Sequence, residues 1–447
     1  MRLPIYIPVL PAQKYSCHGC GSCCRDFTVQ LGEADLQKLH EQGWKERLGQ
    51  EYVVKFRGHS WLKQTDDGAC VFLGDNGLCK VHAEFGLEAK PLACQFFPFM
   101  LSPNVRDTHV GISFACGSVI ASKGADLQSH RGDVRRMSEL LPASTPVPVK
   151  LQDKLIASEA EVSMVEAALD VWMSKKNISP AMRYQGLAWL ITSLLRANLA
   201  NVRGEKLRQL LSTLTDAVEH ELPLLDWPAP TPRAWKLLRQ AVFTRIEDPK
   251  IGDLLKRGKV ASVLGQLSRS RKWGAGKGIS PQTAGFLSID FARFESTVGV
   301  FANQFAGDGA PDNALAKNVA PTHPLDGASG AAMSQQQDQA AMDDLLQRWI
   351  RATILGGRAW GSGLYGLPID QGLGLILVNL LTALWLARFH AAGAGAKSAS
   401  LLDLQVAVGR VDRTSGRAVW LATAGERLRV KWLSHSDSLR LLVRALV

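Results

Sequence analysis

The sequence predicts an α+β protein, in which a small, irregular, cysteine-rich metal-binding N-terminal domain precedes a larger, mostly α-helical region. Three observations support this class. All eight cysteines lie before residue 117 in a chain of 447 residues. The first 120 residues are rich in turns, and helical periodicity dominates after residue 150. With 46% hydrophobic and 21% charged residues and a mean hydropathy near zero, the chain is globular rather than disordered or fibrous.

Short periodic pieces separate the turns of the first segment. The stretch Glu33–Gln42 has acidic residues in its first turn and apolar Leu36 and Leu39 after them, which predicts a helix. Tyr52–Phe56 and Gly111–Phe114 are predicted strands. A segment with so many loops buries little apolar surface, so we expect a bound metal to stabilise it.

Composition divides the chain into five parts. These are a cysteine-cluster domain (1–120), a short helix and Pro-rich linker (121–150), a helical domain (151–303), a flexible low-complexity loop (304–339), and a helical C-terminal part (340–447) that packs with 151–303. The predicted helices are Val134–Leu141, Leu151–Lys175, Pro180–Ala200, Gly204–His220, Pro232–Ile246, Ile251–Ser268, Ala340–Leu355, Gly372–Phe389, Ser398–Gly409 and a closing set within Arg417–Val447.

The strongest motif is a C-x2-C-x2-C-C run formed by Cys17, Cys20, Cys23 and Cys24. Two residues between cysteines allow one tight turn to bring both sulfurs to a single metal, and glycines between them permit the positive backbone torsions that this requires. Adjacent side chains diverge, so Cys24 serves a second site or supports the first. Burial as small apolar residues is the competing interpretation, and four cysteines within eight residues argue against it.

The later cysteines complete a set of eight. Cys70 and Cys79 flank the turn residues Asp75-Asn76-Gly77, which predicts a β-hairpin with one cysteine on each arm, as in zinc ribbons. Cys94 precedes an aromatic block, and Cys116 ends a predicted strand. In a chain that already carries the C-x2-C-x2-C-C run, both are candidate ligands rather than core residues.

Eight sulfurs can form two four-sulfur sites, or one iron–sulfur cluster and one mononuclear metal site. The spacing of Cys17, Cys20 and Cys23 matches the first three ligands of bacterial [4Fe–4S] ferredoxins. The fourth ferredoxin cysteine is absent from its usual place, so a distant residue such as Cys94 would replace it. Thiolates suit iron and zinc alike, and the spacing leaves the metal open. Four histidines near the cysteines are weaker candidate ligands or supporting groups, namely His18, His59, His82 and His109.

These residues resemble a known family. The run Cys17–Cys24, the segment around Val71-Phe72-Leu73, the block Lys90–Pro98 and Cys116 together resemble the CxxCxxCC zinc- or iron-chelating domain family, also called the YkgJ-type cysteine-cluster family. The resemblance covers roughly residues 15–117 and implies metal or iron–sulfur binding by eight cysteines. Lys90 and Gln95 stand where arginines are usual in the family, which removes the bidentate contacts that those arginines would make.

The order of a cysteine cluster and a long helical region is also similar to the flagellin lysine N-methylases. That similarity implies a [4Fe–4S] cluster and S-adenosylmethionine, but no methyl-transfer residue can be assigned from it. Three hypotheses follow: a metalloprotein of unknown reaction, an S-adenosylmethionine-dependent protein lysine N-methylase, and a structural-metal interaction module. No catalytic residue is predicted, and the enzyme class stays open.

Charge and hydropathy limit the kinds of partner and the cellular location that the sequence predicts. Residues 1–120 contain 12 basic and 12 acidic residues, so the net charge of +11 belongs to the rest of the chain, where a protein partner could bind. Prolines interrupt Met1–Pro11, so no signal peptide is expected and the location predicted is cytoplasmic. The apolar run Gly372–Ala387 predicts a buried helix rather than a membrane span. Gly274–Gly278 and Ala391–Ala396 lack the spacing of nucleotide-binding loops, and no specific nucleic-acid motif is present.

Overall fold

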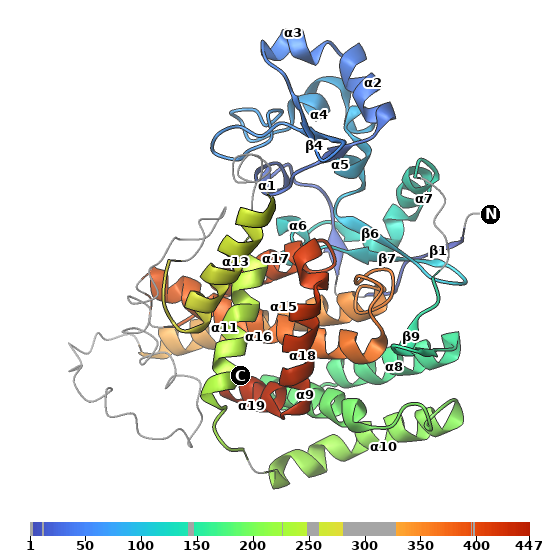
Figure 1. The fold of residues 1–447 in the computed structure, drawn as a ribbon, viewed down its shortest axis with the longest axis vertical. Coiled ribbons are helices and arrows are strands. Elements are labelled where there is room, and N and C mark those ends of the chain that lie inside the picture. Colours follow the sequence, from blue (N-terminus) through green and yellow to red (C-terminus); the bar gives the residue numbers. More distant parts are fainter. Residues whose placement is uncertain are drawn as a thin grey trace.

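The structure, a computed structural model, describes residues 3–10, 13–141, 147–225, 227–247, 259–279, 328–394, 396 and 398–447. A small lobe that contains most of the cysteine-rich segment stands on a larger helical body (Figure 1). The fold class is α+β, as the sequence predicts.

The small lobe is built around a three-stranded antiparallel sheet in the order β3-β5-β4. Its elements are α1 (Ser22–Asp26), β3 (Gln30–Leu31), α2 (Glu33–Glu41), α3 (Trp44–Leu48), β4 (Val53–Phe56), β5 (His59–Leu62), α4 (Lys80–Phe85), the 3₁₀ helix η1 (Leu87–Ala89) and α5 (Leu92–Phe96). Trp44 and Phe72 pack edge to face with ring centroids 5.0 Å apart in a small core of their own. The predicted helix Glu33–Gln42 and strand Tyr52–Phe56 are confirmed as α2 and β4.

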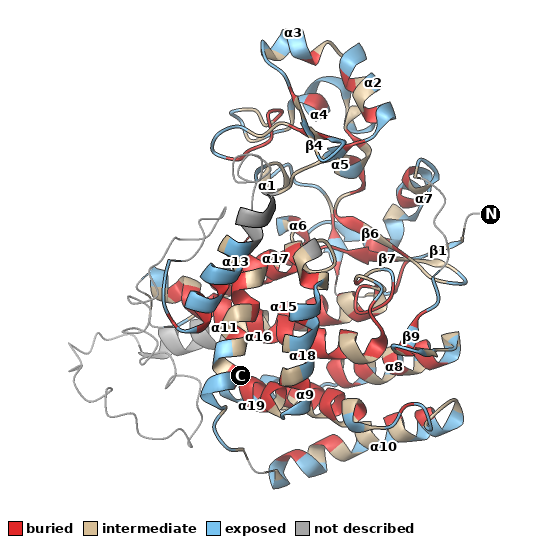
Figure 2. Cartoon of the chain, viewed as in Figure 1, coloured by how far each residue is buried: buried red, intermediate tan, exposed pale blue. Residues whose placement is uncertain are grey.

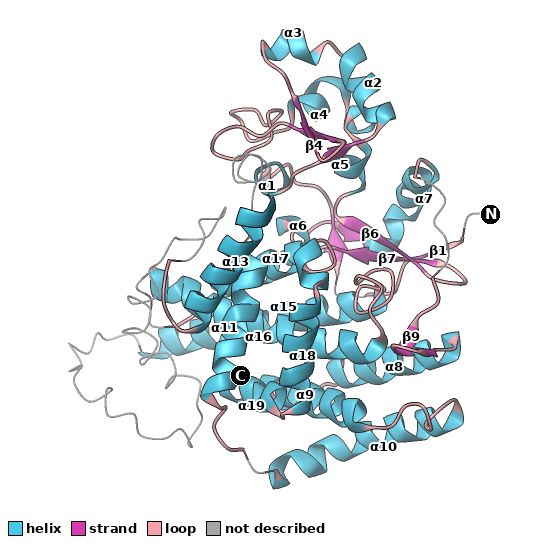
Figure 3. Cartoon of the chain, viewed as in Figure 1, coloured by secondary structure: helices cyan, strands magenta, loops and turns pink. Residues whose placement is uncertain are grey.

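A second sheet lies between the lobe and the helices (Figure 3). Its order is β1-β7-β6, with β1 (Ile5–Tyr6) parallel to β7 (Thr108–Ile112) and β6 (Phe99–Pro103) antiparallel to it. Further short elements of this region are β2 (Lys14–Tyr15), α6 (Gly117–Ile120), β8 (Ala125–Asp126), η2 (Leu127–His130) and α7 (Arg131–Glu139). Phe99, Val110 and Phe114 belong to the same hydrophobic core as the helical body. The domain boundary expected near residue 120 therefore lies inside a continuous core.

The helical body surrounds one central helix, α16. Its elements are α8 (Glu159–Met173), α9 (Pro180–Arg196), α10 (Glu205–Glu221), η3 (Leu222–Leu224), α11 (Pro232–Ile246), α13 (Lys259–Gly274), α15 (Ala328–Leu355), α16 (Ile369–Gly393), α17 (Leu401–Thr414), η5 (Val419–Ala422), α18 (Ala424–His435) and α19 (Ser438–Leu446). α16 contacts α9, α11, α17, α18 and α19. Burial is concentrated along it and its neighbours (Figure 2).

Several helices begin where capping chemistry predicts. The hydroxyl groups of Ser179 and Thr231 each accept a hydrogen bond from the backbone N–H three residues later in the chain. Each of these residues also precedes a proline at the first helical position. The predicted helices Pro180–Ala200, Gly204–His220 and Pro232–Ile246 are confirmed as α9, α10 and α11.

The predicted helix Leu151–Lys175 is wrong at its start. Residues 150–156 form an antiparallel pair of short strands, β9 (Lys150–Gln152) and β10 (Leu155–Ile156). The helix begins after Ser158, whose hydroxyl accepts from the backbone N–H of Glu161, while the Glu161 carboxylate accepts from the Ser158 N–H at 2.8 Å. This capping box fixes the start of α8 more strongly than the apolar periodicity does.

The expected loop 304–339 is wrong over residues 328–339, which form the first turns of α15. Alanine, methionine and glutamine in these turns have high helix propensity, which compositional bias conceals. Residues 304–327, residues 251–258 of the predicted helix Ile251–Ser268, and residues 142–146 of the Pro-rich linker lie outside the described residues.

α16 is, within the described residues, a helix long and apolar enough to cross a membrane. However, 94% of its most apolar window is buried inside the protein. It therefore packs as a core helix, in agreement with the buried helix predicted over Gly372–Ala387.

A buried polar cluster fastens the end of β7 to the helical body. Asp412 in α17 accepts hydrogen bonds from Ser113 Oγ at 2.8 Å and Trp349 Nε1 at 3.1 Å, and it pairs with Arg358 Nη1 at 2.9 Å. Arg358 Nη1 also donates to the carbonyl of Ile112 at 2.8 Å. Burial alone would raise the pKa of Asp412, but Arg358 and the Ser113 hydrogen bond hold the pKa below its ordinary value.

We expect Asp412→Ala to destabilise the protein by about 3–5 kcal/mol, because it leaves the buried Arg358 charge without its partner. Since the pKa of Asp412 is depressed in the folded state, its contribution to stability is present above the unfolded pKa, near 4, and is lost as the pH falls below that value. Urea unfolding of the parent protein and of Asp412→Ala over a range of pH measures this difference in the free energy of unfolding.

The control is Glu139→Ala, which removes an exposed ion pair with Arg135 in α7 and should change stability little. Equal losses in the two variants would contradict the role given to Asp412.

Candidate metal centre

The cysteine run folds as a tight loop that leads into α1. Gly19 and Gly21 have φ values of +64° and +69°, in the left-handed region that favours glycine. A Cβ atom on Gly21 would lie 2.6 Å from the carbonyl oxygen of Gly77, and one on Gly19 would lie 2.8 Å from Leu78 Cδ2. The two glycines therefore allow the cysteine run to lie directly against the turn between Cys70 and Cys79.

The predicted turn at Asp75-Asn76-Gly77 is present, but the hairpin differs from the prediction. Cys79 bridges Leu73, whereas Cys70 bridges Gln64 on the preceding segment. The Cys70 N–H also donates to the Cys24 carbonyl at 2.6 Å. Cys70 thus joins the cysteine run to the chain before the turn and is not the partner of Cys79 across a hairpin.

Cys94 lies in α5, which is held in place by a buried carboxylate. Asp35 Oδ1 accepts from the backbone N–H of Leu92 at 2.9 Å, and Asp35 Oδ2 accepts from Gly32 at 3.1 Å. Gln95 Nε2 donates to the carbonyls of Glu88 and Lys90, at 3.1 and 2.6 Å. The amide at residue 95 therefore organises the loop before α5 rather than binding an anion.

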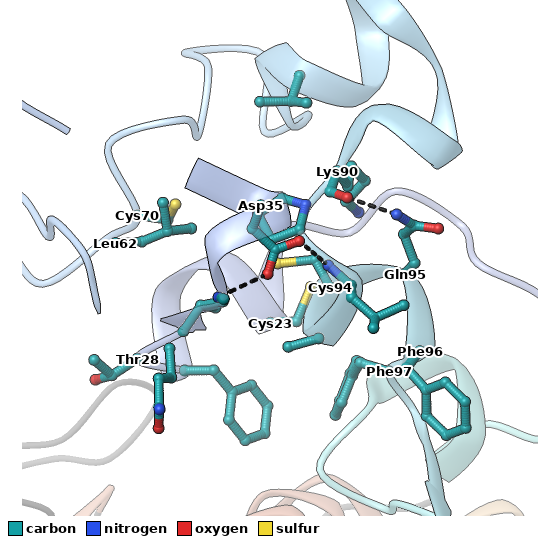
Figure 4. Close-up of a pocket in the computed structure, with 18 of the residues that line it drawn as sticks. Cys23, Thr28, Asp35, Leu62, Cys70, Lys90, Cys94, Gln95, Phe96 and Phe97 are labelled. Atoms are coloured by element: carbon teal, nitrogen blue, oxygen red, sulfur yellow. Dashed lines mark hydrogen bonds between the residues drawn. The ribbon is translucent and has the colours of Figure 1, made fainter. Parts of the chain in front are cut away.

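Five of the eight cysteines line one cavity. The cavity has a volume of about 830 Å³ and is lined by residues of the small lobe, of β6 and of the segment directly after α7, together with Arg417. Part of this lining is drawn in Figure 4. The cysteines of the cavity are Cys23, Cys24, Cys70, Cys79 and Cys94.

The other three cysteines lie outside this cavity. Cys17 and Cys20 are exposed, and Cys116 is half-buried at the start of α6, on the helical body. Cys116 is close enough to Cys20 and Cys23 for their charges to raise its pKa, although burial is the larger cause. Cys23 therefore lines the cavity and is also near Cys116.

Hydrogen bonding among the cavity thiols separates their acidities. Cys24 neighbours both Cys23 and Cys79, and hydrogen bonding to its thiol is the main cause that lowers the pKa of Cys23 to about 7 and that of Cys79 to about 6. The pKa of Cys24 itself is raised. Burial raises the pKa of Cys70 to about 11 and also raises that of Cys94.

Lys90 is the cation of this group. Burial disfavours its charge, but the thiolates of Cys79 and Cys94 outweigh that and raise its pKa above the ordinary value. The ammonium group therefore offsets negative charge that would gather as thiols ionise.

The histidines singled out in the sequence do not join the cysteines. His18 Nδ1 lies 3.0 Å from Ser118 Oγ, His59 contacts Gln30, and His109 lies 3.2 Å from Asp107. His82 is exposed. Throughout the described part of the chain, no three cysteine, histidine or acidic side chains are already arranged to hold a metal ion.

Sequence reasoning missed Arg417. Arg417 lines the cavity although it is far in the sequence from the other lining residues, which all lie between residues 23 and 141. Its guanidinium lies over the rings of Phe27 and Phe97, 5.0 and 5.8 Å from their centroids. No local motif surrounds it, so only the fold reveals it.

The comparisons with known proteins agree with a cysteine-cluster metal-binding class. Residues 16–116 match the family CxxCxxCC, described as a "Putative zinc- or iron-chelating domain". This segment of the chain therefore matches a domain described as zinc- or iron-chelating, which supports metal binding as its general role.

One relative is similar to a short part of the chain. An uncharacterized protein of Methanocaldococcus jannaschii is 38% identical over an aligned stretch of 94 residues, and the match covers 19% of this chain and 29% of that protein. The chain thus spans less than a third of the relative's length. No solved structure matches the chain, and the similarity to flagellin lysine N-methylases is not confirmed.

We expect Gly21→Ala to reduce the metal content of the purified protein at least severalfold. The new Cβ would overlap the Gly77 carbonyl and separate the cysteine run from the turn that carries Cys79. Metal analysis of the variant and the parent protein measures the effect.

The matched control is Gly49→Ala. Gly49 has a similar φ of +62° but open space at its Cβ position, so it adds only backbone strain of about 1 kcal/mol. If the two variants retain equal metal, the close approach at Gly21 does not matter for binding.

Proposed function

We propose that this is a cysteine-cluster metalloprotein in which all eight cysteines bind metal at two four-sulfur sites. The observation that carries this proposal is the position of Cys23, which lines the cavity with four other cysteines and is also near enough to Cys116 to affect its pKa. The inner site would use Cys24, Cys70, Cys79 and Cys94. The outer site would use Cys17, Cys20, Cys23 and Cys116.

The inner set is supported by proximity and burial. Cys24 and Cys79 affect each other's pKa as near neighbours, and the backbone carbonyl of Cys24 accepts from the Cys70 N–H. Cys94 completes the set from α5, and its acidity responds to the charges of Cys70 and Cys79. Four thiolates are a donor set that suits a thiophilic metal.

The outer set is supported by sequence spacing and by a shared neighbour. Cys17, Cys20 and Cys116 all raise the pKa of Tyr15, in which burial is the largest cause. We therefore assign Cys116, rather than Cys94, as the fourth ligand that joins Cys17, Cys20 and Cys23. This spacing favours a [4Fe–4S] cluster at the outer site, whereas zinc or iron ions fit the inner one.

The donor chemistry fits these metals, although the sulfurs do not yet surround a common point. Ligand closure on binding is usual, because a metal site is rarely complete without its ion. When bound, an iron–sulfur cluster would supply electron transfer, and zinc would supply a structural link. Lys90 would hold its positive charge beside the inner thiolates and favour their ionised form.

Metal analysis of anaerobically purified variants tests the division. We expect Cys20→Ser to lose the metal of the outer site only, because it removes one of its four ligands, and Cys79→Ser to lose that of the inner site only. The double variant should lose both. Iron, zinc and acid-labile sulfide are measured, with visible absorption as the sign of a cluster.

His82→Ala is the control, since His82 is exposed and three residues from Cys79, and it should retain both metals. If Cys20→Ser alone or Cys79→Ser alone removes all of the bound metal, the cysteines form a single shared centre and the two-site proposal is wrong. A parent protein that contains neither iron nor zinc would refute the function altogether.

A further inference from the structure

The cavity beside the cysteines is larger than the sulfurs alone require and has an apolar wall. Its volume of about 830 Å³ lies within the range of sites that enclose small molecules. Phe27, Leu92, Phe96, Phe97 and Met100 line it. Such a wall suits the apolar body of an organic ligand.

Arg417 supplies a cation with unsatisfied hydrogen-bonding capacity. Its Nη1 atom is buried and has no hydrogen-bond partner within the described residues. The nearby acid Asp412 is already used by Arg358, Ser113 and Trp349. Leaving a buried guanidinium nitrogen unpaired is costly, and a bound anion would remove that cost.

Among the described residues, neither carboxylate of the cavity lining forms an ion pair with Arg417. Both oxygens of Asp35 accept backbone hydrogen bonds, and Lys38 donates to a carbonyl. Glu33, the other acid of the lining, is exposed. Lys90 lies beside the thiols and offsets their charge, so Arg417 is the cation of the lining that is left for a ligand.

We propose that this cavity binds a small organic anion whose carboxylate or phosphate group pairs with Arg417. Arginine presents a planar fork of donors that matches either group. The apolar body of the ligand lies between the phenylalanines, next to Cys23 and Cys94. This site goes beyond metal binding, and neither Arg417 nor the apolar wall is a metal ligand.

Calorimetry with three probes of matched shape tests the proposal on the full-length, metal-containing protein. Naphthoate and naphthyl phosphate represent the two kinds of anion, and naphthalenemethanol is their neutral counterpart. We expect at least one anion to bind about tenfold more tightly than the alcohol, and the tighter anion identifies the group that the site prefers.

Arg417→Gln should weaken anion binding about tenfold and leave alcohol binding unchanged, and Arg417→Lys should restore part of the difference. Arg413→Gln is the matched control, because Arg413 lies over Phe27 at 5.2 Å but does not line the cavity. That variant should bind all three probes as the parent does.

Two results would overturn the proposal. One is that no probe binds or that all three bind equally, and the other is that Arg417→Gln and Arg413→Gln weaken binding to the same extent. Metal content is measured in every sample, so loss of the metal is recognised separately from loss of the anion site. Alcohol binding by Arg417→Gln shows that the cavity wall is intact.

Discussion

The close contact between the cysteine run and the turn before α4 determines the rest of the candidate site. The Cys70 N–H donates to the Cys24 carbonyl at 2.6 Å, and Gly21 has no side chain to obstruct the Gly77 carbonyl. Because the two segments meet at backbone distance, Cys23, Cys24 and Cys79 share one environment. This contact also accounts for the cavity and for the different pKa values of the three thiols.

A second constraint fixes the remaining cysteine. Cys116 follows Ser113, whose hydroxyl is bonded to Asp412 in the interior of the helical body. Cys116 therefore moves with the helices, whereas Cys70 and Cys79 move with the small lobe and its separate core. Although the eight cysteines are confined to a quarter of the sequence, Cys24, Cys70 and Cys79 pack with one hydrophobic core and Cys116 with the other.

Much of this arrangement could be predicted from local pattern. The glycines of the cysteine run and the turn at Asp75-Asn76-Gly77 are backbone requirements that a sequence displays directly. The core helix Gly372–Ala387 was equally visible from its apolar run. The start of α8 was not, because the Ser158 capping box competes with periodicity, and neither was the helix over 328–339, because biased composition resembles a loop.

The parts that could not be predicted depend on contacts between distant segments. Nothing near Cys70 indicates that it pairs with Gln64 rather than across the hairpin. Cys94 and Cys116 are equivalent candidates by spacing, and only the fold places Cys116 towards Cys20. Arg417 reaches the cavity through the packing of α17, which no pattern around residue 417 reveals.

The position of Cys116 has a mechanical consequence. A metal shared by Cys116 and the loop Cys17–Cys23 would cross-link the two cores, much as a disulfide closes a long loop and restricts the unfolded chain. Arg417 and Phe27 already meet across the same seam. Metal bound at the outer site would then restrict motion of the lobe relative to the helices. The width of the cavity between them would depend on whether this metal is present.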